Sequence, residues 1–513
     1  METSHRTMPH TSMSLSHVND RIYPFVQWAG SAENQPFPQP SDFSSVMIMQ
    51  HPARTELWAI LRLSGPLIAS QLAHMLMVLT DTLMMARLSP EALAGGGLGA
   101  ASYSFVSIFC IGVIAAVGTL VAIRHGAGDI EGATRLTQAG LWLAWLMALA
   151  AGLLLWNLEP LLLMFGQTET NVHSAGQFLT ILPFALPGYL SFMALRGFTS
   201  AIGKATPVMV ISLGGTVLNY LLNHALIEGM FGLPKLGLMG IGLVTAIVAN
   251  GMALALMWYI RSNRSYAAYP LSAGLLRLDT RYLRELWRLG LPIGGTYAVE
   301  VGLFAFAALC MGTMGSTQLA AHQIALQIVS VAFMVPAGMS YAVTMRIGQH
   351  YGAGQLLQAR MAGRVGIGFG ATVMLGFAAV LWLYSDPLIG LLIDHNDPAF
   401  HDVIVLAVSL LAVAAWFELF DGVQTIAMGC IRGLKDAKTT FLIGAGCYWL
   451  IGAPSAWLMA FTLGWGPTGV WWGLALGLAC AAVSLTWAFE AKMKRMIRRE
   501  PETYSTLQAA QPD

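Results

Sequence analysis

The feature that most constrains this chain is a run of about 20 apolar residues that recurs along nearly its whole length. A helical run of that length crosses the roughly 30 Å of hydrocarbon in a lipid bilayer. Charged residues make up 10% of the sequence, whereas a soluble domain carries roughly 25%. The pattern excludes a soluble globule. It predicts an all-α integral membrane protein, because a lipid-exposed segment satisfies its backbone polar groups within a helix.

The apolar runs predict twelve transmembrane helices in two groups of six. The first group covers 57–86, 93–123, 136–156, 174–195, 207–227 and 238–260, and the second covers 283–311, 319–347, 365–384, 403–429, 441–463 and 470–489. We therefore expect a disordered cytoplasmic tail (1–55), a first lobe (56–262), a cytoplasmic linker (263–281), a second lobe (282–492) and a cytoplasmic C-terminal tail (493–513).

The distribution of Lys and Arg supports this count and predicts an orientation. Of the 27 basic residues, all but Arg87 and Lys235 fall in the predicted tails, in alternate loops or at the span ends that adjoin them. Cytoplasmic loops of membrane proteins are enriched in Lys and Arg. The bias predicts that both termini are cytoplasmic. The net charge of +1 gives no reason to expect a nucleic-acid partner.

The two halves of the chain resemble each other. A shift of 226 residues places Pro66 on Pro292, and it places the His125-Gly-Ala-Gly128 run on Tyr351-Gly-Ala-Gly354. With a different offset, Arg196-Gly197 resembles Arg432-Gly433. Because each repeat holds an even number of spans, the repeats are predicted to be parallel and related by an axis along the membrane normal. Two six-helix lobes around a central cavity suit alternating access.

Four acidic residues lie in the interior of the predicted spans: Asp81, Glu300, Glu418 and Asp421. A charge at the bilayer centre costs about 2.5–3.5 kcal/mol on insertion scales, so it requires a reason. No Lys or Arg is predicted at a mid-span position to pair with them. Burial without a cationic partner favours the neutral form, so these carboxylates are expected to take up a proton or a metal cation.

Spacing groups some of these residues. Glu418 and Asp421 are three residues apart and share a helix face, so they are expected to titrate as a pair or to hold Na⁺. Asn219 and Asn223 share a face of the fifth span. They either bind an ion or Asp81, or hold helices together. His74 lies two turns before Asp81, and a packing role is favoured there over a proton relay.

The chain resembles the multidrug and toxic compound extrusion (MATE) family, in particular its NorM-like bacterial branch, from about Glu56 to Lys492. The motifs that carry the resemblance are Gly65-Pro66-Leu67-Ile68, Thr80-Asp81-Thr82, Leu88-Ser89-Pro90-Glu91-Ala92-Leu93-Ala94, Ala320-Ala321-His322-Gln323-Ile324-Ala325-Leu326 and Arg432-Gly433-Leu434-Lys435-Asp436.

The resemblance implies roles for individual residues. It implies that Asp81, with Asn219 and Asn223, acts in proton binding or cation-linked rearrangement, and that Glu300 and Asp421 bind a monovalent cation such as Na⁺. Phe417 stands where related transporters can have a tyrosine, and Glu418 is not part of the implied pattern. We expect Phe417, Tyr297 and Gln323 to line a substrate cavity.

The resulting hypothesis is a secondary active antiporter that exports organic, often cationic, compounds in exchange for Na⁺ or H⁺. The expected partners are small-molecule drugs or toxic organic cations and the lipid bilayer. The protein is expected to be a monomer in the bacterial inner membrane.

Two alternatives were weighed against the antiporter. A lipid-linked oligosaccharide flippase of the related superfamily is disfavoured, because the intramembrane charges are acidic and the spans number twelve. An intramembrane enzyme is disfavoured, because the spans contain no His-Glu-x-x-His run and no Gly-x-Ser-x-Gly motif.

Overall fold

The computed structural model describes residues 52–164, 166, 168–228, 236–273, 279–393 and 400–509. Within these residues all the regular elements are helical. Most of the predicted N-terminal tail lies outside them. The helices of the first half are α1 (Pro52–Leu88), α2 (Pro90–Gly126), α3 (Ile130–Trp156), α4 (Glu159–Met164), α5 (Glu169–Ile181), η1 (Leu182–Phe184), α6 (Ala185–Ala201), α7 (Thr206–Glu228) and α8 (Gly237–Ser262).

The second half begins after a short 3₁₀ turn, η3 (Arg264–Tyr266). Its helices are α9 (Thr280–Met314), α10 (Ser316–Gly352), α11 (Leu356–Leu383), α12 (Ser385–Gly390), α13 (His401–Gly433), α14 (Ala437–Gly446), η5 (Cys447–Gly452), α15 (Ala453–Trp457), η6 (Leu458–Thr462) and α16 (Gly466–Ala509). The segments η5 and η6 are π-helical.

Twelve helices of the described chain are long and apolar enough to cross a membrane, which confirms the predicted number. The fourth is built from α5, η1 and α6, and the eleventh runs from α14 to η6. Several helices extend beyond the predicted apolar runs. For example, α11 begins at Leu356 rather than at residue 365, because hydropathy marks only the part of a helix that lies in hydrocarbon.

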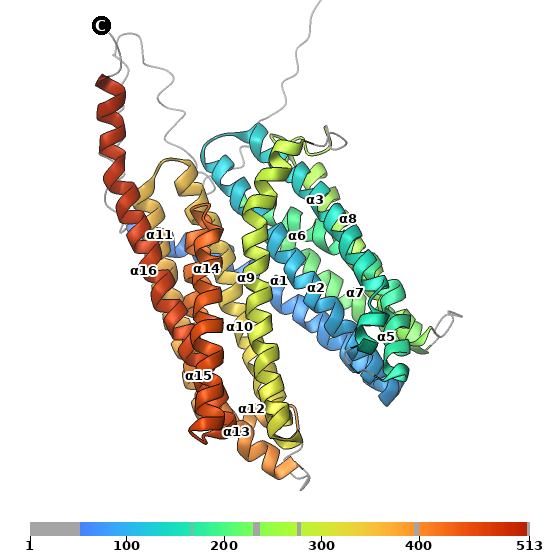
Figure 1. The fold of residues 1–513 in the computed structure, drawn as a ribbon. Coiled ribbons are helices and arrows are strands. Elements are labelled where there is room, and N and C mark those ends of the chain that lie inside the picture. Colours follow the sequence, from blue (N-terminus) through green and yellow to red (C-terminus); the bar gives the residue numbers. More distant parts are fainter. Residues whose placement is uncertain are drawn as a thin grey trace, which may run out of the picture. The chain divides into compact units, whose positions relative to one another are not determined.

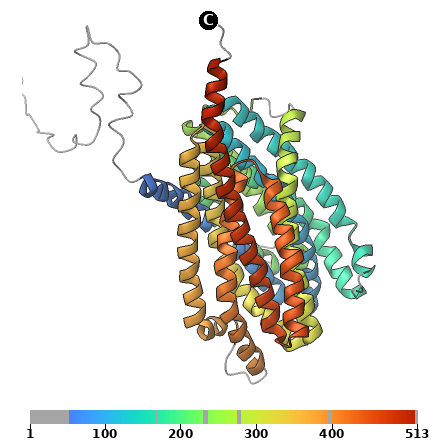
Figure 2. The same cartoon turned by 60° about the vertical axis from the view of Figure 1, so that its left-hand side comes forward.

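The buried apolar side chains form two large clusters that follow the two halves of the sequence. One is drawn almost entirely from α1–α8 and the start of α9, and the other from the rest of α9 through α16. Figure 1 shows α2, α3 and α5–α8 on one side of α9 and α11 and α14–α16 on the other, and Figure 2 brings the second group forward. We call these groups the first and second lobes.

Helix α1 joins the lobes because it packs against both. Ile60, near its start, belongs to the second cluster, whereas Leu63 and Leu67 belong to the first. Near the same end, the Glu56 carboxylate accepts two hydrogen bonds of 2.8 Å from the Arg346 guanidinium on α10. A bidentate pair of this kind fixes orientation as well as distance.

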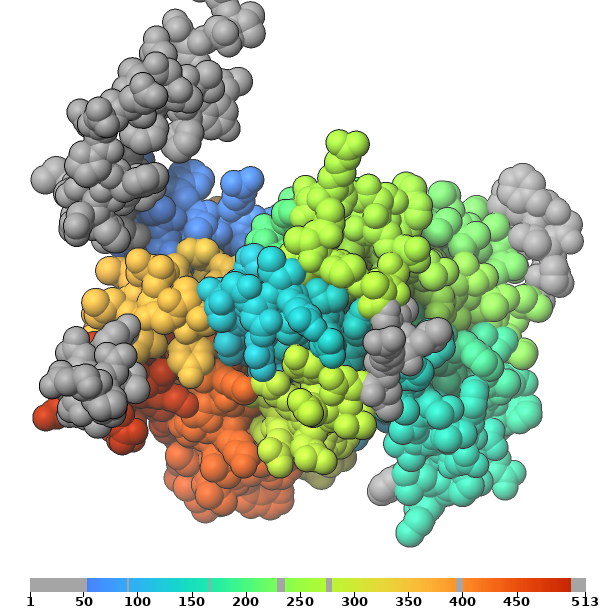
Figure 3. All heavy atoms as spheres, turned by 90° about the horizontal axis from the view of Figure 1, so that it is seen from above, coloured from blue at the N-terminus to red at the C-terminus, as the bar shows by residue number. Residues whose placement is uncertain are grey.

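One end of the bundle carries most of the basic turns, and we call it the basic end. It is defined by Arg124, Lys204, Arg284, Arg364 and Lys435 at the ends of α2, α6, α9, α11 and α13. Figure 3 views this end, where the surface around residues 125–135 lies beside that around residues 350–365.

The lobes contact each other closely near the basic end. Gly126 and Gly352, which occupy equivalent positions in the sequence repeat, both lie at this contact. A Cβ added to Gly126 would meet the backbone of Gln349, and one added to Gly352 would meet the backbone of Ile123. The Gln349 side chain also donates a hydrogen bond of 2.7 Å to the carbonyl oxygen of Ala201 on α6. Backbone therefore packs on backbone where the two halves meet.

The segment that links the lobes is packed onto the first lobe. The Tyr269 hydroxyl lies 2.7 Å from Nδ1 of His125, and the Gln138 amide donates to the carbonyl oxygens of Leu271 and Ala273 at 3.0 Å. At the other end of the chain, α16 continues to Ala509, so residues 493–509 of the predicted C-terminal tail extend the last helix.

Candidate functional site

Asp81 lies on α1 in the first lobe and accepts three hydrogen bonds from two other helices. Its Oδ1 accepts from the amides of Asn219 (3.1 Å) and Asn223 (2.7 Å) on α7, and its Oδ2 accepts from the Thr245 hydroxyl (2.9 Å) on α8. Asn223 also donates to the Asn219 carbonyl at 3.3 Å. The i, i+4 spacing on α7 brings both amides to one carboxylate, as one of the two interpretations of the sequence expected.

Thr245 was not predicted from the sequence. It lies on a different helix from Asp81 and from the two asparagines, and apolar spans contain many threonines that bond only to their own backbone. The unusual feature of Thr245 is its second acceptor: it donates to Asp81 in addition to the Ile241 carbonyl oxygen (3.0 Å). The structure places His74 away from Asp81. Its Nε2 lies 3.0 Å from the Tyr189 hydroxyl and the two rings stack at 4.9 Å.

A cavity of about 430 Å³ lies between the lobes. Side chains from the second lobe form most of its wall, including the carboxylates of Glu300 and Asp421, and Tyr297. The first lobe contributes Gln71, Ile108 and Ile111. The remaining lining residues are mostly apolar, aromatic or hydroxyl-bearing: Val301, Phe304, Leu326, Val329, Ser330, Phe333, Met334, Ala337, Ser340, Tyr341, Thr425, Met428 and Arg432. An apolar wall with a few polar groups is typical of a small-molecule site.

Glu300 and Asp421 are linked through the amide of Gln424. The Gln424 amide nitrogen donates to Oε1 of Glu300 (3.3 Å) and to Oδ1 of Asp421 (2.9 Å), while its carbonyl oxygen accepts from the Tyr448 hydroxyl. Gln424 lies one turn after Asp421 on α13. Neither carboxylate forms an ion pair in the described part of the chain, so each keeps oxygen lone pairs that a cation would use.

Glu418 is buried beside this pair, and its surroundings are different. It is 0% exposed, and neither of its carboxylate oxygens has a hydrogen-bond partner. Buried polar atoms without partners are rare in folded proteins and call for an unseen water, proton or ion. Glu418 therefore has the largest unused capacity to accept a proton or a cation among the buried acidic residues of this lobe that the structure describes.

Of the three residues expected to line the substrate cavity, the structure brings only Tyr297 to it. Phe417 is 1% exposed and packs edge-to-face on Phe304 and Trp471, which turns it into the core of the second lobe. Gln323 on α10 is exposed and is not among the residues that line the cavity. Helix periodicity fixes which residues share a face, but it does not say which face meets the cavity.

The sequence predicted no Lys or Arg at a mid-span position, and the structure adds two arginines that are buried near the ends of the tenth and fourth spans. Arg432 belongs to α13 and lines the cavity with Glu300 and Asp421. Its guanidinium donates to the Tyr297 hydroxyl (3.0 Å) and to the Ser340 hydroxyl (3.2 Å). Arg196 is likewise buried within α6. The spans predicted from the sequence end before these arginines, because a charged residue lowers the local hydropathy. The Arg-Gly match between the repeats was the available signal.

The Asp81 site in the first lobe is therefore separate from the Glu300–Asp421 site in the second lobe. Asp81 is not among the cavity-lining residues, whereas Glu300 and Asp421 are. Among the described residues, no group of three or more His, Cys, Asp or Glu side chains is arranged to hold a metal ion. A monovalent cation at Glu300 and Asp421 would therefore take part of its oxygen ligands from other groups, such as hydroxyls, carbonyls or water.

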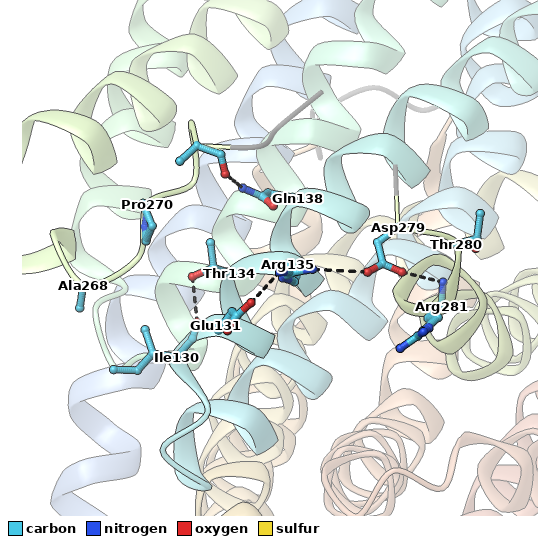
Figure 4. A pocket seen from close by; sticks show the side chains of 11 residues that line it. Ile130, Glu131, Thr134, Arg135, Gln138, Ala268, Pro270, Asp279, Thr280 and Arg281 are labelled. Atoms are coloured by element: carbon cyan, nitrogen blue, oxygen red, sulfur yellow. Dashed lines mark hydrogen bonds and ion pairs between the residues drawn. The ribbon is translucent and has the colours of Figure 1, made fainter. Parts of the chain in front are cut away.

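A larger pocket of about 870 Å³ lies at the basic end, between the start of α3 and the linker (Figure 4). The pocket has two acidic and two basic side chains, and three of these four are paired with one another. Arg135 lies 2.6 Å from Glu131 and 3.8 Å from Asp279. These groups are at the surface, and their charges neutralise one another. For this reason we take the cavity between the lobes as the candidate functional site.

Twelve spans in two lobes, with a partly acidic cavity between them, define the chain as a membrane transporter. The family model for MatE matches residues 66–224 and 292–458, one match in each half, and the two matches begin at the prolines that the repeat superimposes. The chain belongs to the MatE family, and it is a NorM-like member.

Relatives and solved structures agree with this assignment. The "Probable multidrug resistance protein NorM" of Pseudomonas putida is 76% identical over 443 residues, which cover 86% of this chain and 96% of the relative. The protein of the same name from Pseudomonas aeruginosa is 63% identical over 449 residues, covering 88% and 92%.

Among solved structures, the eukaryotic MATE transporter AtDTX14 matches with a TM-score of 0.77 and 21% identity, over 88% of this chain and all of the other. An outward-facing MATE transporter of the MOP superfamily matches with a TM-score of 0.78 and 19% identity, over 87% and 97%. At these identities the structural likeness supports the fold alone. The curated relatives are transporters rather than enzymes, and the flippase alternative is not favoured.

Proposed function

We propose that this protein exports organic, often cationic, compounds across the bacterial inner membrane in exchange for Na⁺ or H⁺. The relatives named as multidrug resistance proteins support drugs as the cargo. The single observation that carries the coupling proposal is the acidic wall of the cavity between the lobes. There, Glu300 and Asp421 share one amide donor and have no ion-pair partner among the described residues.

The cavity suits a cargo of this class. Its aromatic and methionine side chains offer adaptable apolar contact, and the carboxylates offer attraction for a positive charge. A proton or Na⁺ at the same carboxylates competes with a cationic cargo, since either one neutralises them. Each elementary charge that crosses 100 mV contributes about 2.3 kcal/mol, so one coupled cation supports appreciable accumulation outside.

Asp81 is proposed to respond to the cation in the first lobe. Its carboxylate accepts three hydrogen bonds from α7 and α8. Protonation would remove acceptor capacity from one oxygen and change how α1 is held against those helices. Coupling requires such a difference between two lobe arrangements, because a ligand shifts an equilibrium only by its differential affinity for the two states.

The orientation follows from the charge bias. If the basic end is cytoplasmic, as the distribution of Lys and Arg indicates, then both termini are cytoplasmic. The close lobe contacts at Gly126, Gly352, Glu56 and Arg346 then close the lobes against each other on the cytoplasmic side. We further propose that the protein works as a monomer, since one chain supplies both lobes.

The test is efflux of tetraphenylphosphonium from liposomes that contain the purified protein, with Na⁺ and pH gradients imposed separately. We expect Asp421→Asn and Asp81→Asn to reduce gradient-driven efflux at least tenfold, with normal expression and membrane insertion. Asp402→Asn is the matched control, because Asp402 is an exposed acid in the first turn of the same helix as Asp421. Efflux at the wild-type rate in both site variants would refute the assignment.

A further inference from the structure

Arg196 is a buried cation without a carboxylate partner. It lies on α6 with 4% of its surface exposed, and it forms no ion pair in the described part of the chain. Its Nη1 donates to the Gln71 side-chain oxygen and lies 3.7 Å from the Met193 sulfur, while Nη2 has no hydrogen-bond partner. Burying an unpaired charge is unfavourable. A different arrangement of the lobes that hydrates or pairs the Arg196 guanidinium would therefore lower its free energy.

The guanidinium of Arg196 covers an aromatic ring of the other lobe. Its Cζ lies 4.7 Å from the ring centroid of Tyr341 on α10, within the range of a cation–π contact. The Tyr341 hydroxyl lies 3.5 Å from that of Tyr297, which in turn accepts the hydrogen bond from Arg432. Arg432 also stands over the Tyr297 ring, at 5.7 Å. Both cavity tyrosines are therefore covered by guanidinium groups of the protein itself.

The sequence repeat distinguishes the Arg196–Tyr341 contact from the Arg432–Tyr297 contact. The shift that superimposes Pro66 on Pro292 also places Gln71 on Tyr297. Arg196 donates to Gln71 just as Arg432 donates to Tyr297. Arg432 therefore makes its contacts within its own lobe, whereas Arg196 makes the equivalent bond and also reaches across the lobe interface to Tyr341.

This contact separates the cavity from the basic end. Tyr341 lines the large cavity and also a small space of about 30 Å³ that Arg196, Ser200 and Met345 border. Ser200 is one residue from the end of α6, and Met345 lies two turns from the end of α10. The Arg196–Tyr341 pair is thus the floor of the cavity on the side that faces the basic end.

We propose that Arg196 is an inner gate that occupies the aromatic face on which an organic cation would otherwise bind. When the gate is closed, Arg196 covers the Tyr341 ring and the organic cation cannot bind there. Closure therefore favours release of the cation from the cavity. When the lobes part at the basic end, the Tyr341 ring is uncovered and accepts a new cation. Cargo binding and gate closure exclude each other, so an organic cation promotes opening toward the side from which it is loaded.

This inference rests on the proposed function, because it takes an organic cation as the cargo. Its test measures gate opening directly and needs no ion gradient. All five native cysteines are replaced by alanine, and Ser200→Cys is introduced. Ser200 is 1% exposed and its hydroxyl has no hydrogen-bond partner, so the thiol costs no existing bond. Labelling of this cysteine by a polar maleimide is then followed in nanodiscs, with and without tetraphenylphosphonium.

We expect Arg196→Gln and Tyr341→Leu each to increase the labelling rate roughly tenfold, the scale of a desolvated cation–π contact. Tyr341→Phe keeps the aromatic face and should label like the parent protein. Arg364→Gln is the matched control, since it removes a guanidinium paired with Glu490 inside the second lobe. Tetraphenylphosphonium should accelerate labelling of the parent but not of Arg196→Gln. Elution as a single monodisperse species checks that each variant folds.

Three results would overturn the gate: labelling of Arg196→Gln at the parent rate, equal labelling of Tyr341→Phe and Tyr341→Leu, or no response of the parent to tetraphenylphosphonium. None of these depends on transport. Absence of gradient-driven efflux in the wild type would instead refute the proposed function and leave the labelling result intact. Because Tyr341→Leu and Tyr341→Phe act from the other lobe, the test remains decisive if Arg196→Gln fails to fold.

Discussion

The effect of adding a methyl group at the Gly126–Gly352 contact between the lobes can be predicted quantitatively. Gly126 ends α2 and Gly352 ends α10, and each faces backbone of the opposite lobe. A Cβ at Gly126 would lie 2.7 Å from the carbonyl carbon of Gln349, and one at Gly352 would lie 2.8 Å from that of Ile123. Ordinary contact begins at 3.4 Å. Because the obstructing atoms are backbone, no side-chain rotation relieves the overlap, and Gly126→Ala must push the helices apart.

The expected size of the effect follows from the cost of overpacking. Inserting a methyl group into a tightly packed contact costs about 1–3 kcal/mol. The strain exists only while the lobes are closed at the basic end, so it shifts the closed-to-open ratio by about 5-fold to 150-fold at about 1.4 kcal/mol per tenfold. Gly126→Ala and Gly352→Ala both strain the same contact between α2 and α10. The free-energy change of the double variant should therefore be smaller than the sum of the two single changes.

Distance measurements between spin labels on the two lobes report this shift. Glu131→Cys on α3 and Leu357→Cys on α11 are suitable sites, because both side chains are well exposed near the basic end. We expect Gly126→Ala to add a population at longer distance. Gly97→Ala is the control on the same helix, since a Cβ there meets nothing within 4 Å. Identical distance distributions in Gly126→Ala, Gly97→Ala and the parent would refute the argument.

Two further predictions concern the polar contacts. Thr245→Val removes the hydroxyl that donates to Oδ2 of Asp81. Leaving an acceptor unpaired costs about 1–3 kcal/mol, so we expect efflux to fall about tenfold. Thr372→Val, which loses only a bond to its own helix, is the control, and equal rates would contradict the role of Thr245. Asp436 lies between α13 and α14: burial alone would raise its pKa, but hydrogen bonds from Lys492 and Thr439 outweigh this and lower the pKa. Because the pKa is lower in the folded protein, ionised Asp436 stabilises the fold at pH values above its unfolded-state pKa of about 3.9. This stabilisation is lost as the pH falls through the folded-state pKa. Asp436→Asn should therefore be less stable than the wild type by about 1 kcal/mol at pH 7. Thermal melts should show this difference shrinking as pH falls below about 4, and a constant difference from pH 7 to pH 3 would contradict it.

The sequence by itself determined the number of spans, their charge bias and the internal repeat. These properties are local or periodic. A window of about 20 residues decides whether a segment prefers hydrocarbon, and a constant offset between halves needs no knowledge of packing. The same local reasoning identified the intramembrane acids Asp81, Glu300, Glu418 and Asp421, because a carboxylate in an apolar run is conspicuous wherever it points.

Only the tertiary structure decided what those acids contact. Thr245 and Gln424 became partners of carboxylates through helix packing, and Arg196 reached Tyr341 across the lobe interface. The same packing turned Phe417 away from the cavity. Helical spacing tells which residues share a face, but every face of a span in a polytopic protein is apolar enough to meet lipid, another helix or a cavity. Which of these it meets is settled by the fit of side chains and glycine-lined crossings between segments far apart in sequence.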